Sequence, residues 1–137
     1  MSKVAISSPH APKPLGPYSA ALRTGDLLFV SGQIPVDPST GELVDSDVSV
    51  QTRCVLENVG ALLKAAGLTF DAVVRTTVFL ADMNDFAGMN EVYRTYFSDP
   101  YPARSTIQAA RLPRGARIEI DAIASFESGA SGVERLD

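Results

Sequence analysis

The chain has 137 residues, of which 45% are hydrophobic, so it can bury the core of a single globular domain. Its net charge of -4 and its pI of about 4.9 disfavour nucleic-acid binding, which usually requires a basic surface. One cysteine and one histidine are too few for a disulfide framework, a zinc site or a nucleophile–histidine arrangement within one chain.

Prolines are frequent in the first 17 residues, so we expect an extended arm there rather than regular structure. The following residues predict two strands, 18–23 and 27–34, joined by a turn. The second strand, LLFVSGQI, is apolar on both faces and must be covered on both sides. Tyr18 could offer its hydroxyl to a ligand, although ring packing at a strand start is commoner. The Gly at position 32 is typical of a bulge or a close backbone approach.

A polar loop over residues 35–45, with an optional short strand near 42–44, leads to the first predicted helix. Apolar residues recur at helical spacing from about 47 to 66, and Gly67 is a natural end. Cys54 borders this apolar stripe and is predicted to be a small buried side chain rather than a reactive thiol.

The β-branched, apolar segment 72–81 is typical of a central strand. A second helix is predicted over 85–97, with Asp82 or Asn84 as its cap. Asn90 falls within the apolar stripe of this helix. It is either a buried structural amide or a group that reaches a partner chain, and the sequence leaves both possibilities open.

The stretch 101–124 predicts two more strands, joined by a turn at residues 113–115 into a hairpin. A symmetric hairpin would place Arg104 near Asp121. The Gly/Ser-rich tail, residues 126–137, is expected to be flexible.

The same hairpin register would bring Thr106 near Glu119 and a guanidinium close to a carboxylate. An Arg matches a carboxylate with two parallel donors, and a Glu can hold or deprotonate a water, so the pair suggests chemistry on a small carboxylic acid. An ordinary cross-strand ion pair on a solvated face is the commoner arrangement, and spacing alone does not exclude it.

The predicted order is β-β-(β)-α-β-α-β-β, a mixed α/β (α+β) sheet with two helices on one face. Since at least two strands are apolar on both faces, the uncovered face needs a partner, and self-association is the simplest solution.

No phosphate-binding glycine loop is present, and no lysine is placed for a Schiff base, so we expect neither cofactor nor metal. The sequence has no signal-peptide pattern and no apolar run of membrane-spanning length, so we expect a cytoplasmic protein without membrane contact.

Four segments carry a resemblance to a known family: GPYSAA at 16–21, VSGQIPV at 30–36, RTTVFLADMNDFAGMNEVYRTYF at 75–97 and PARSTIQAARLPRGARIEIDAIA at 102–124. Together they resemble the RidA/YjgF family of reactive-intermediate deaminases over residues 14–125. The resemblance implies one chorismate-mutase-like domain over 1–137, with an N-terminal arm at 1–13, assembled as a homotrimer with sites in the clefts between subunits.

The resemblance also implies an activity, the cofactor-independent hydrolysis of 2-iminopropanoate and 2-iminobutanoate to 2-keto acids and ammonia. This would detoxify imines that pyridoxal-phosphate enzymes release. Two alternatives stay open: a larger enamine acid such as 2-aminomuconate as substrate, and a non-catalytic protein that binds keto acids or acts as a holdase. The acidic pI makes the ribonuclease label of some relatives the weakest option.

Carried over residue by residue, the family's pattern gives the carboxylate-binding Arg104, the water-positioning Glu119, the pocket tyrosine Tyr18, and the pocket-lining Ser31 and Gly32. Thr106 stands where many members have a cysteine, so only its backbone carbonyl could help to hold water. Asn90 completes the set as a candidate for substrate binding.

Overall fold

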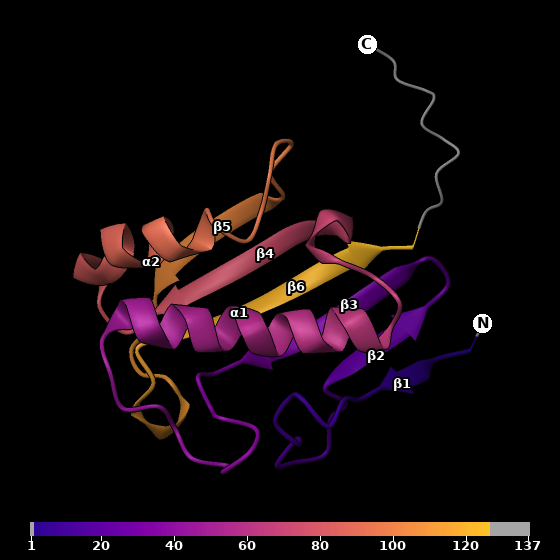
Figure 1. Cartoon of the computed structure of the whole chain (residues 1–137), viewed down its shortest axis with the longest axis horizontal. Coiled ribbons are helices and arrows are strands. Elements are labelled where there is room, and N and C mark those ends of the chain that lie inside the picture. The colour runs from indigo at the N-terminus through magenta and orange to yellow at the C-terminus, as the bar shows by residue number, and fades with distance from the viewer. Residues whose placement is uncertain (1, 127–137) are drawn as a thin grey trace.

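Six strands form one sheet in the computed structural model, which describes residues 2–126, and two α-helices lie across one face of it (Figure 1). The strands are β1 Val4–Ile6, β2 Ala21–Thr24, β3 Leu27–Gln33, β4 Val73–Leu80, β5 Ala103–Gln108 and β6 Ile118–Ser125. The helices are α1 Val48–Ala65 and α2 Phe86–Tyr93. This confirms the predicted α+β fold with both helices on one face.

The strand order is β1-β2-β3-β6-β4-β5, and β4–β5 is the only parallel pair among the described strands. The predicted hairpin of the last two strands is therefore wrong. Strands β5 and β6 flank β4 on opposite sides, and Arg104 lies opposite Thr76 instead of near Asp121. The reason is that α2 carries the chain across to the far side of β4, whereas every second residue of β6 is buried and requires a central position.

The N-terminal arm also differs from the prediction, because Val4–Ile6 forms β1 and pairs antiparallel with β2. The prolines begin only at Pro9, so nothing prevents the residues before it from pairing with the open edge of β2. Tyr18 precedes β2 rather than starting it, and the optional strand near 42–44 is reduced to a single bridge between Leu43 and Val36.

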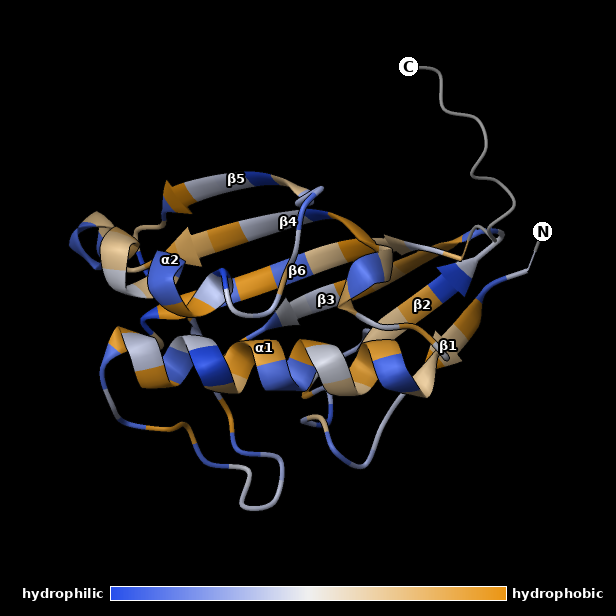
Figure 2. Cartoon of the chain, turned by 45° about the horizontal axis from the view of Figure 1, so that its top comes forward, coloured by the Kyte–Doolittle hydropathy of each residue, from blue (hydrophilic) through white to orange (hydrophobic). Residues whose placement is uncertain are grey.

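Helix α1 matches its prediction closely. The side chain of Asp47 caps its N-terminus by accepting a hydrogen bond from the Val50 N–H at 3.0 Å. Its apolar stripe packs on the sheet, with Val55, Leu62 and Leu63 fully buried. The ribbon of α1 in Figure 2 carries both hydrophobic and hydrophilic residues, as an amphipathic helix does.

Helix α2 is shorter than predicted and ends at Tyr93. The predicted cap Asp82 accepts a hydrogen bond from the Asn84 N–H, but it caps the short 3₁₀ turn Met83–Asp85 that precedes α2. Neither α-helix within residues 2–126 combines the length and hydropathy that a membrane-spanning segment requires.

The second face of the sheet carries exposed apolar side chains. In β6, Ile118 and Ile120 are buried under the helices, whereas Glu119 points to the other face. By register, Phe29 and Ile107 share the face of Glu119, and they are 38% and 46% exposed. The structure therefore has the uncovered face that the sequence predicts, which we call the open face; its coverage by further subunits stays a prediction.

Candidate active site

Arg104 lies on β5, an edge strand, on the same face of the sheet as the two helices. Its Nη1 donates a hydrogen bond to Asn90 Oδ1 at 2.8 Å. Its guanidinium carbon lies 4.7 Å from the ring centre of Tyr93 and 5.6 Å from that of Phe86. Helix α2 thus supplies an amide and two aromatic faces to one cation.

The positive charge of Arg104 is not neutralised within residues 2–126, where the one ion pair joins Arg94 to Glu91 on the surface. The half-buried guanidinium opens into a cavity of about 260 Å³. A planar cation with free donors in a small pocket can bind a carboxylate through two parallel hydrogen bonds.

Glu119 lies on the open face and lines a different cavity, of about 790 Å³, together with Tyr18, Ser31, Gly32 and Arg114. Partial burial, and secondarily the negative charge of Asp121, raise the pKa of the Glu119 carboxyl above its ordinary value. A carboxylate that binds a proton more readily is a better base toward a water molecule.

Gly32 is required by the position of Glu119. A Cβ at Gly32 would lie 2.9 Å from Cδ of Glu119 and would overlap its Oε2. The register of β3 with β6 shifts between Val30 and Gln33, so the predicted bulge or close approach at this glycine is confirmed. The bulge brings the backbone of β3 directly against the carboxyl group.

Ser31 and Tyr18 border the same cavity in different ways. The Ser31 hydroxyl donates a hydrogen bond to the Ser19 carbonyl at 2.7 Å, and this bond fixes the segment before β2. Tyr18 is 54% exposed, and its ring is not packed into the core as the commoner alternative requires. Thr106 lies on β5 opposite Val78, on the same face as Arg104.

The predicted site residues therefore form two groups within one chain. We call Arg104, Asn90 and Tyr93 the arginine half-site, and we call Glu119 with the residues of its cavity the glutamate half-site. The two lie on opposite faces of the sheet with β4 between their strands. The predicted pairing of Arg104 with Asp121 and of Thr106 with Glu119 is wrong, because β4 separates β5 from β6.

Sequence reasoning missed the surroundings of Arg104. Phe86, Asn90 and Tyr93 have the i, i+4, i+7 spacing of a single helix face, which could have indicated that all three meet the same group. Arg114 was assigned only to a turn. It has a left-handed backbone with φ of 60° and borders the glutamate half-site.

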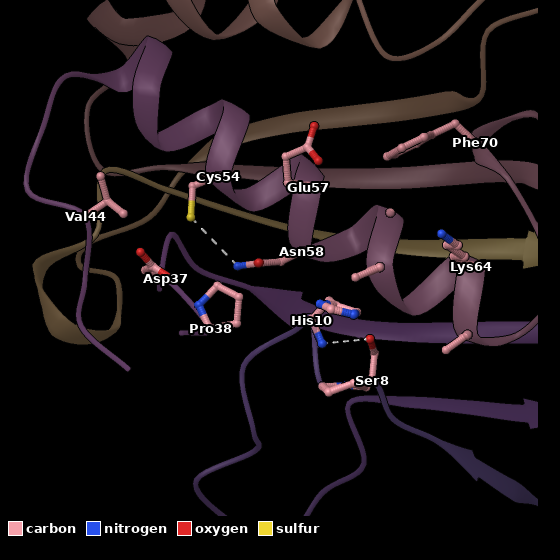
Figure 3. Close-up of a pocket in the computed structure, with 14 residues that line it drawn as sticks. Ser8, His10, Asp37, Pro38, Val44, Cys54, Glu57, Asn58, Lys64 and Phe70 are labelled. Carbon is pink, nitrogen blue, oxygen red and sulfur yellow. Dashed lines mark hydrogen bonds between the residues drawn. The ribbon is translucent and has the colours of Figure 1, made fainter. Parts of the chain in front are cut away.

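A third cavity, of about 920 Å³, lies between the N-terminal arm and the outer side of α1 (Figure 3). It contains His10 and Cys54 but none of the predicted site residues. Cys54 is half-buried rather than fully buried as predicted. Its Sγ lies 3.5 Å from the Val36 carbonyl oxygen, and burial raises the pKa of the thiol, which agrees with the predicted absence of a reactive thiol. Across residues 2–126 no cluster of His, Cys, Asp and Glu could hold a metal ion.

Fold and site together define a small α+β domain with a half-buried arginine against an amide and aromatic rings, and a half-buried glutamate on the other face of the sheet. A family model described as Endoribonuclease L-PSP matches residues 8–126, and the chain belongs to this family, which is also called YjgF/RidA.

Three relatives illustrate the similarity. A RutC family protein of Pyrococcus horikoshii is 54% identical over 91% of this chain and 99% of its own length. The mouse protein named 2-iminobutanoate/2-iminopropanoate deaminase is 51% identical over 87% of this chain and 88% of its own. The structure of Escherichia coli TdcF with bound serine has a TM-score of 0.84 and 47% identity, and covers 89% of this chain and 98% of that one. Family and relatives support a RidA-type deaminase.

Proposed function

We propose that the protein hydrolyses short 2-imino and enamine acids, 2-iminopropanoate and 2-iminobutanoate among them, to 2-keto acids and ammonia. The observation that carries this proposal is the Arg104 guanidinium, which is held by a neutral amide and aromatic rings and is not paired with an acid among the described residues. Such a cation suits the carboxylate that all these substrates share. The name of the mouse relative supports the choice of reaction.

The same proposal includes a homotrimer whose sites form between subunits. The arginine half-site and the glutamate half-site lie on opposite faces of one chain, so they can act on one substrate only if they come from different chains. The open face carries exposed apolar side chains that a neighbouring subunit would bury. A head-to-tail contact would then join Arg104 of one subunit to Glu119 of the next.

In the proposed mechanism, Arg104 binds the substrate carboxylate and fixes the imine carbon near a water held by Glu119. The Glu119 carboxylate takes a proton from this water while the oxygen of the water forms a bond to the imine carbon. The substrate reacts as its iminium form, in which the nitrogen already carries the extra proton, so the π electrons of the C=N bond move to nitrogen and leave a neutral amine. Glu119 then gives its proton to this amine of the carbinolamine. The C–N bond breaks, and ammonia leaves while the O–H proton passes to a solvent water and the ketone forms.

The two half-sites are sufficient for this reaction in energetic terms. An imine carbon is already electrophilic, so fixed orientation of the substrate and a local base supply most of what is needed. The raised pKa of Glu119 suits a group that must first accept and then return a proton.

The test follows the decay of imines that an amino-acid oxidase or threonine dehydratase generates, with semicarbazide as the trap. Wild type should accelerate the decay, and Arg104→Ala should lose about 100-fold or more of kcat/KM, because it removes a charged contact to the substrate. Arg53→Ala, an exposed arginine on α1, is the matched control and should act as wild type does. If wild type accelerates no imine of any small side chain, the proposed reaction is wrong.

The volume of the glutamate half-site, about 790 Å³, favours one second candidate, a larger enamine acid such as 2-aminomuconate. Comparing kcat/KM across imines of increasing side-chain length separates the two. A non-catalytic keto-acid binder would show Arg104-dependent binding without turnover. Glu119→Gln would then have no turnover to reduce.

A further inference from the structure

Helix α2 surrounds the Arg104 guanidinium on two sides. Asn90 Oδ1 accepts a hydrogen bond from Nη1 at 2.8 Å, which fixes the direction of the guanidinium within its plane. The Tyr93 ring lies against the guanidinium, with 4.7 Å between the ring centre and Cζ, which fixes the tilt of that plane. Two contacts of different kinds thus orient one cation.

Tyr93 is itself held by a contact of its hydroxyl with β4. Its hydroxyl lies 2.7 Å from Thr76 Oγ1, and the two residues are 5% and 1% exposed. Thr76 is also the strand partner of Arg104 in the β4–β5 register. The backbone of Arg104, the Thr76 hydroxyl, the Tyr93 ring and the guanidinium therefore form a closed loop of contacts.

Every group that orients the guanidinium is uncharged. Asn90 is an amide, and burial raises the pKa of the Tyr93 hydroxyl, which keeps the phenol neutral. An aspartate at position 90 would make the same hydrogen bond but would neutralise the cation. The observed arrangement gives orientation and leaves the charge available.

We propose that Asn90, Tyr93 and Thr76 are positioning residues that hold the Arg104 guanidinium in one orientation while they leave its charge free for a substrate carboxylate. This inference rests on the proposed function, in which Arg104 receives that carboxylate. It assigns Asn90 to the arginine rather than to the substrate, gives Tyr93 a role, and adds Thr76 to the arginine half-site.

The first experiment separates positioning from mere burial of two hydroxyls. Thr76→Val and Tyr93→Phe each leave one buried hydroxyl without its partner and should lower the Tm, whereas the double variant removes both hydroxyls and should regain most of that loss. The KM for 2-iminobutanoate should rise about threefold to tenfold in Tyr93→Phe and stay raised in the double variant, with kcat falling less than KM rises. If KM recovers together with Tm in the double variant, the pair is only structural and the inference is overturned.

The second experiment changes charge without changing shape. In Asn90→Asp the new carboxylate should occupy Arg104, so KM should rise about tenfold or more while the Tm stays equal or increases. Asn90→Leu removes the hydrogen bond without adding charge and should raise KM by a smaller factor. An unchanged KM in Asn90→Asp would overturn the inference.

Direct binding of 2-oxobutanoate, measured by calorimetry on the full chain, makes failure of the inference distinguishable from failure of the proposed reaction. If wild type binds this keto acid through Arg104 but accelerates no imine hydrolysis, the reaction is wrong, and weaker binding by Tyr93→Phe and Asn90→Asp still supports the inference. If both variants bind as tightly as wild type, the inference is overturned whatever the turnover. If wild type itself binds no carboxylate, Arg104 is not a receptor and the inference is overturned too.

Discussion

Glu119 is a carboxyl group whose surroundings oppose its ionisation. Partial burial against the backbone of β3 disfavours the charged form, and the neighbouring Asp121 adds repulsion. A group with this environment reduces the stability of the folded chain when it is charged. That effect is tolerable where the charge is needed for chemistry.

The first prediction concerns the pH dependence of stability. The folded chain binds a proton at Glu119 at higher pH than the unfolded chain does, so the free energy of unfolding falls as pH rises from the ordinary pKa of 4.5 through the raised value. Glu119→Gln removes this fall and should be more stable than wild type above that interval, while its turnover drops about 100-fold or more. Urea unfolding at a fixed chain concentration across this pH range measures the difference. Identical pH dependence in both proteins would contradict the assignment.

The second prediction concerns the close approach of Gly32 to the same carboxyl. In Gly32→Ala the new methyl group displaces the Glu119 side chain, which is flexible at that end, so the Tm should change little and turnover should fall about tenfold to 100-fold. Gly16→Ala is the control, since a Cβ there would meet only the Tyr18 ring at an ordinary 3.6 Å. If Gly32 acts through Glu119, the double variant Gly32→Ala/Glu119→Gln should be no slower than Glu119→Gln alone.

At the scale of elements, α1 is specified by local signals. Its apolar spacing and its end near Gly67 were predicted from the sequence. The helix was expected over about 47–66 and spans Val48–Ala65 in the structure. The Asp47 cap is another local signal, because its side chain accepts a hydrogen bond from the Val50 N–H.

The third prediction tests this cap. Asp47→Ala should lower the free energy of unfolding by about 1 kcal/mol, because one N–H of the first turn loses its partner. Thermal or urea unfolding measures the loss, and turnover at 25 °C should not change. Asp45→Ala, in the loop before the helix, is the matched control and should leave the unfolding curve in place. Equal losses in both variants would show that charge, rather than capping, is responsible.

Strand pairing was less predictable than strand existence. The β-branched, apolar composition of β4 and the alternation in β6 identified both as strands, but nothing local in 101–124 reveals that β6 inserts between β3 and β4. A turn between two strands favours a hairpin, and only the crossover through α2 and the burial of β6 on alternate residues override that preference. Strand β1 was missed for a related reason, since its pairing depends on the edge of β2 and not on its own short sequence.

The candidate site shows the same division. The candidate site residues were named from the family's motifs, and their roles stay predictions. The neighbours of Arg104 could not be named, because Arg104 meets Asn90 and Tyr93 only after α2 packs on the sheet. The pairing of Arg104 with Asp121 was predicted wrongly for the same reason as the hairpin. The sequence therefore supplied candidate residues, whereas their juxtaposition required the topology.

At the scale of the whole molecule, the open face and the two half-sites point to one assembly. A single chain exposes Phe29 and Ile107 on the face that also carries Glu119, while Arg104 lies on the other face at the edge strand β5. The cyclic arrangement of subunits that we propose would cover the open face and bring each edge strand toward the glutamate half-site of a neighbour. A single contact between subunits would then both bury the open face and bring the two half-sites together.

The last prediction tests whether the half-sites are shared, by mixing two inactive chains. Co-expressed Arg104→Ala and Glu119→Gln subunits form mixed oligomers in which some interfaces combine an intact arginine half-site with an intact glutamate half-site. With random mixing in equal amounts, about one quarter of head-to-tail interfaces contain both intact residues, so about one quarter of wild-type turnover should return. Each variant expressed alone is the control and should stay inactive. If each site lies within one subunit, every site in the mixture carries one of the two substitutions, and no activity returns.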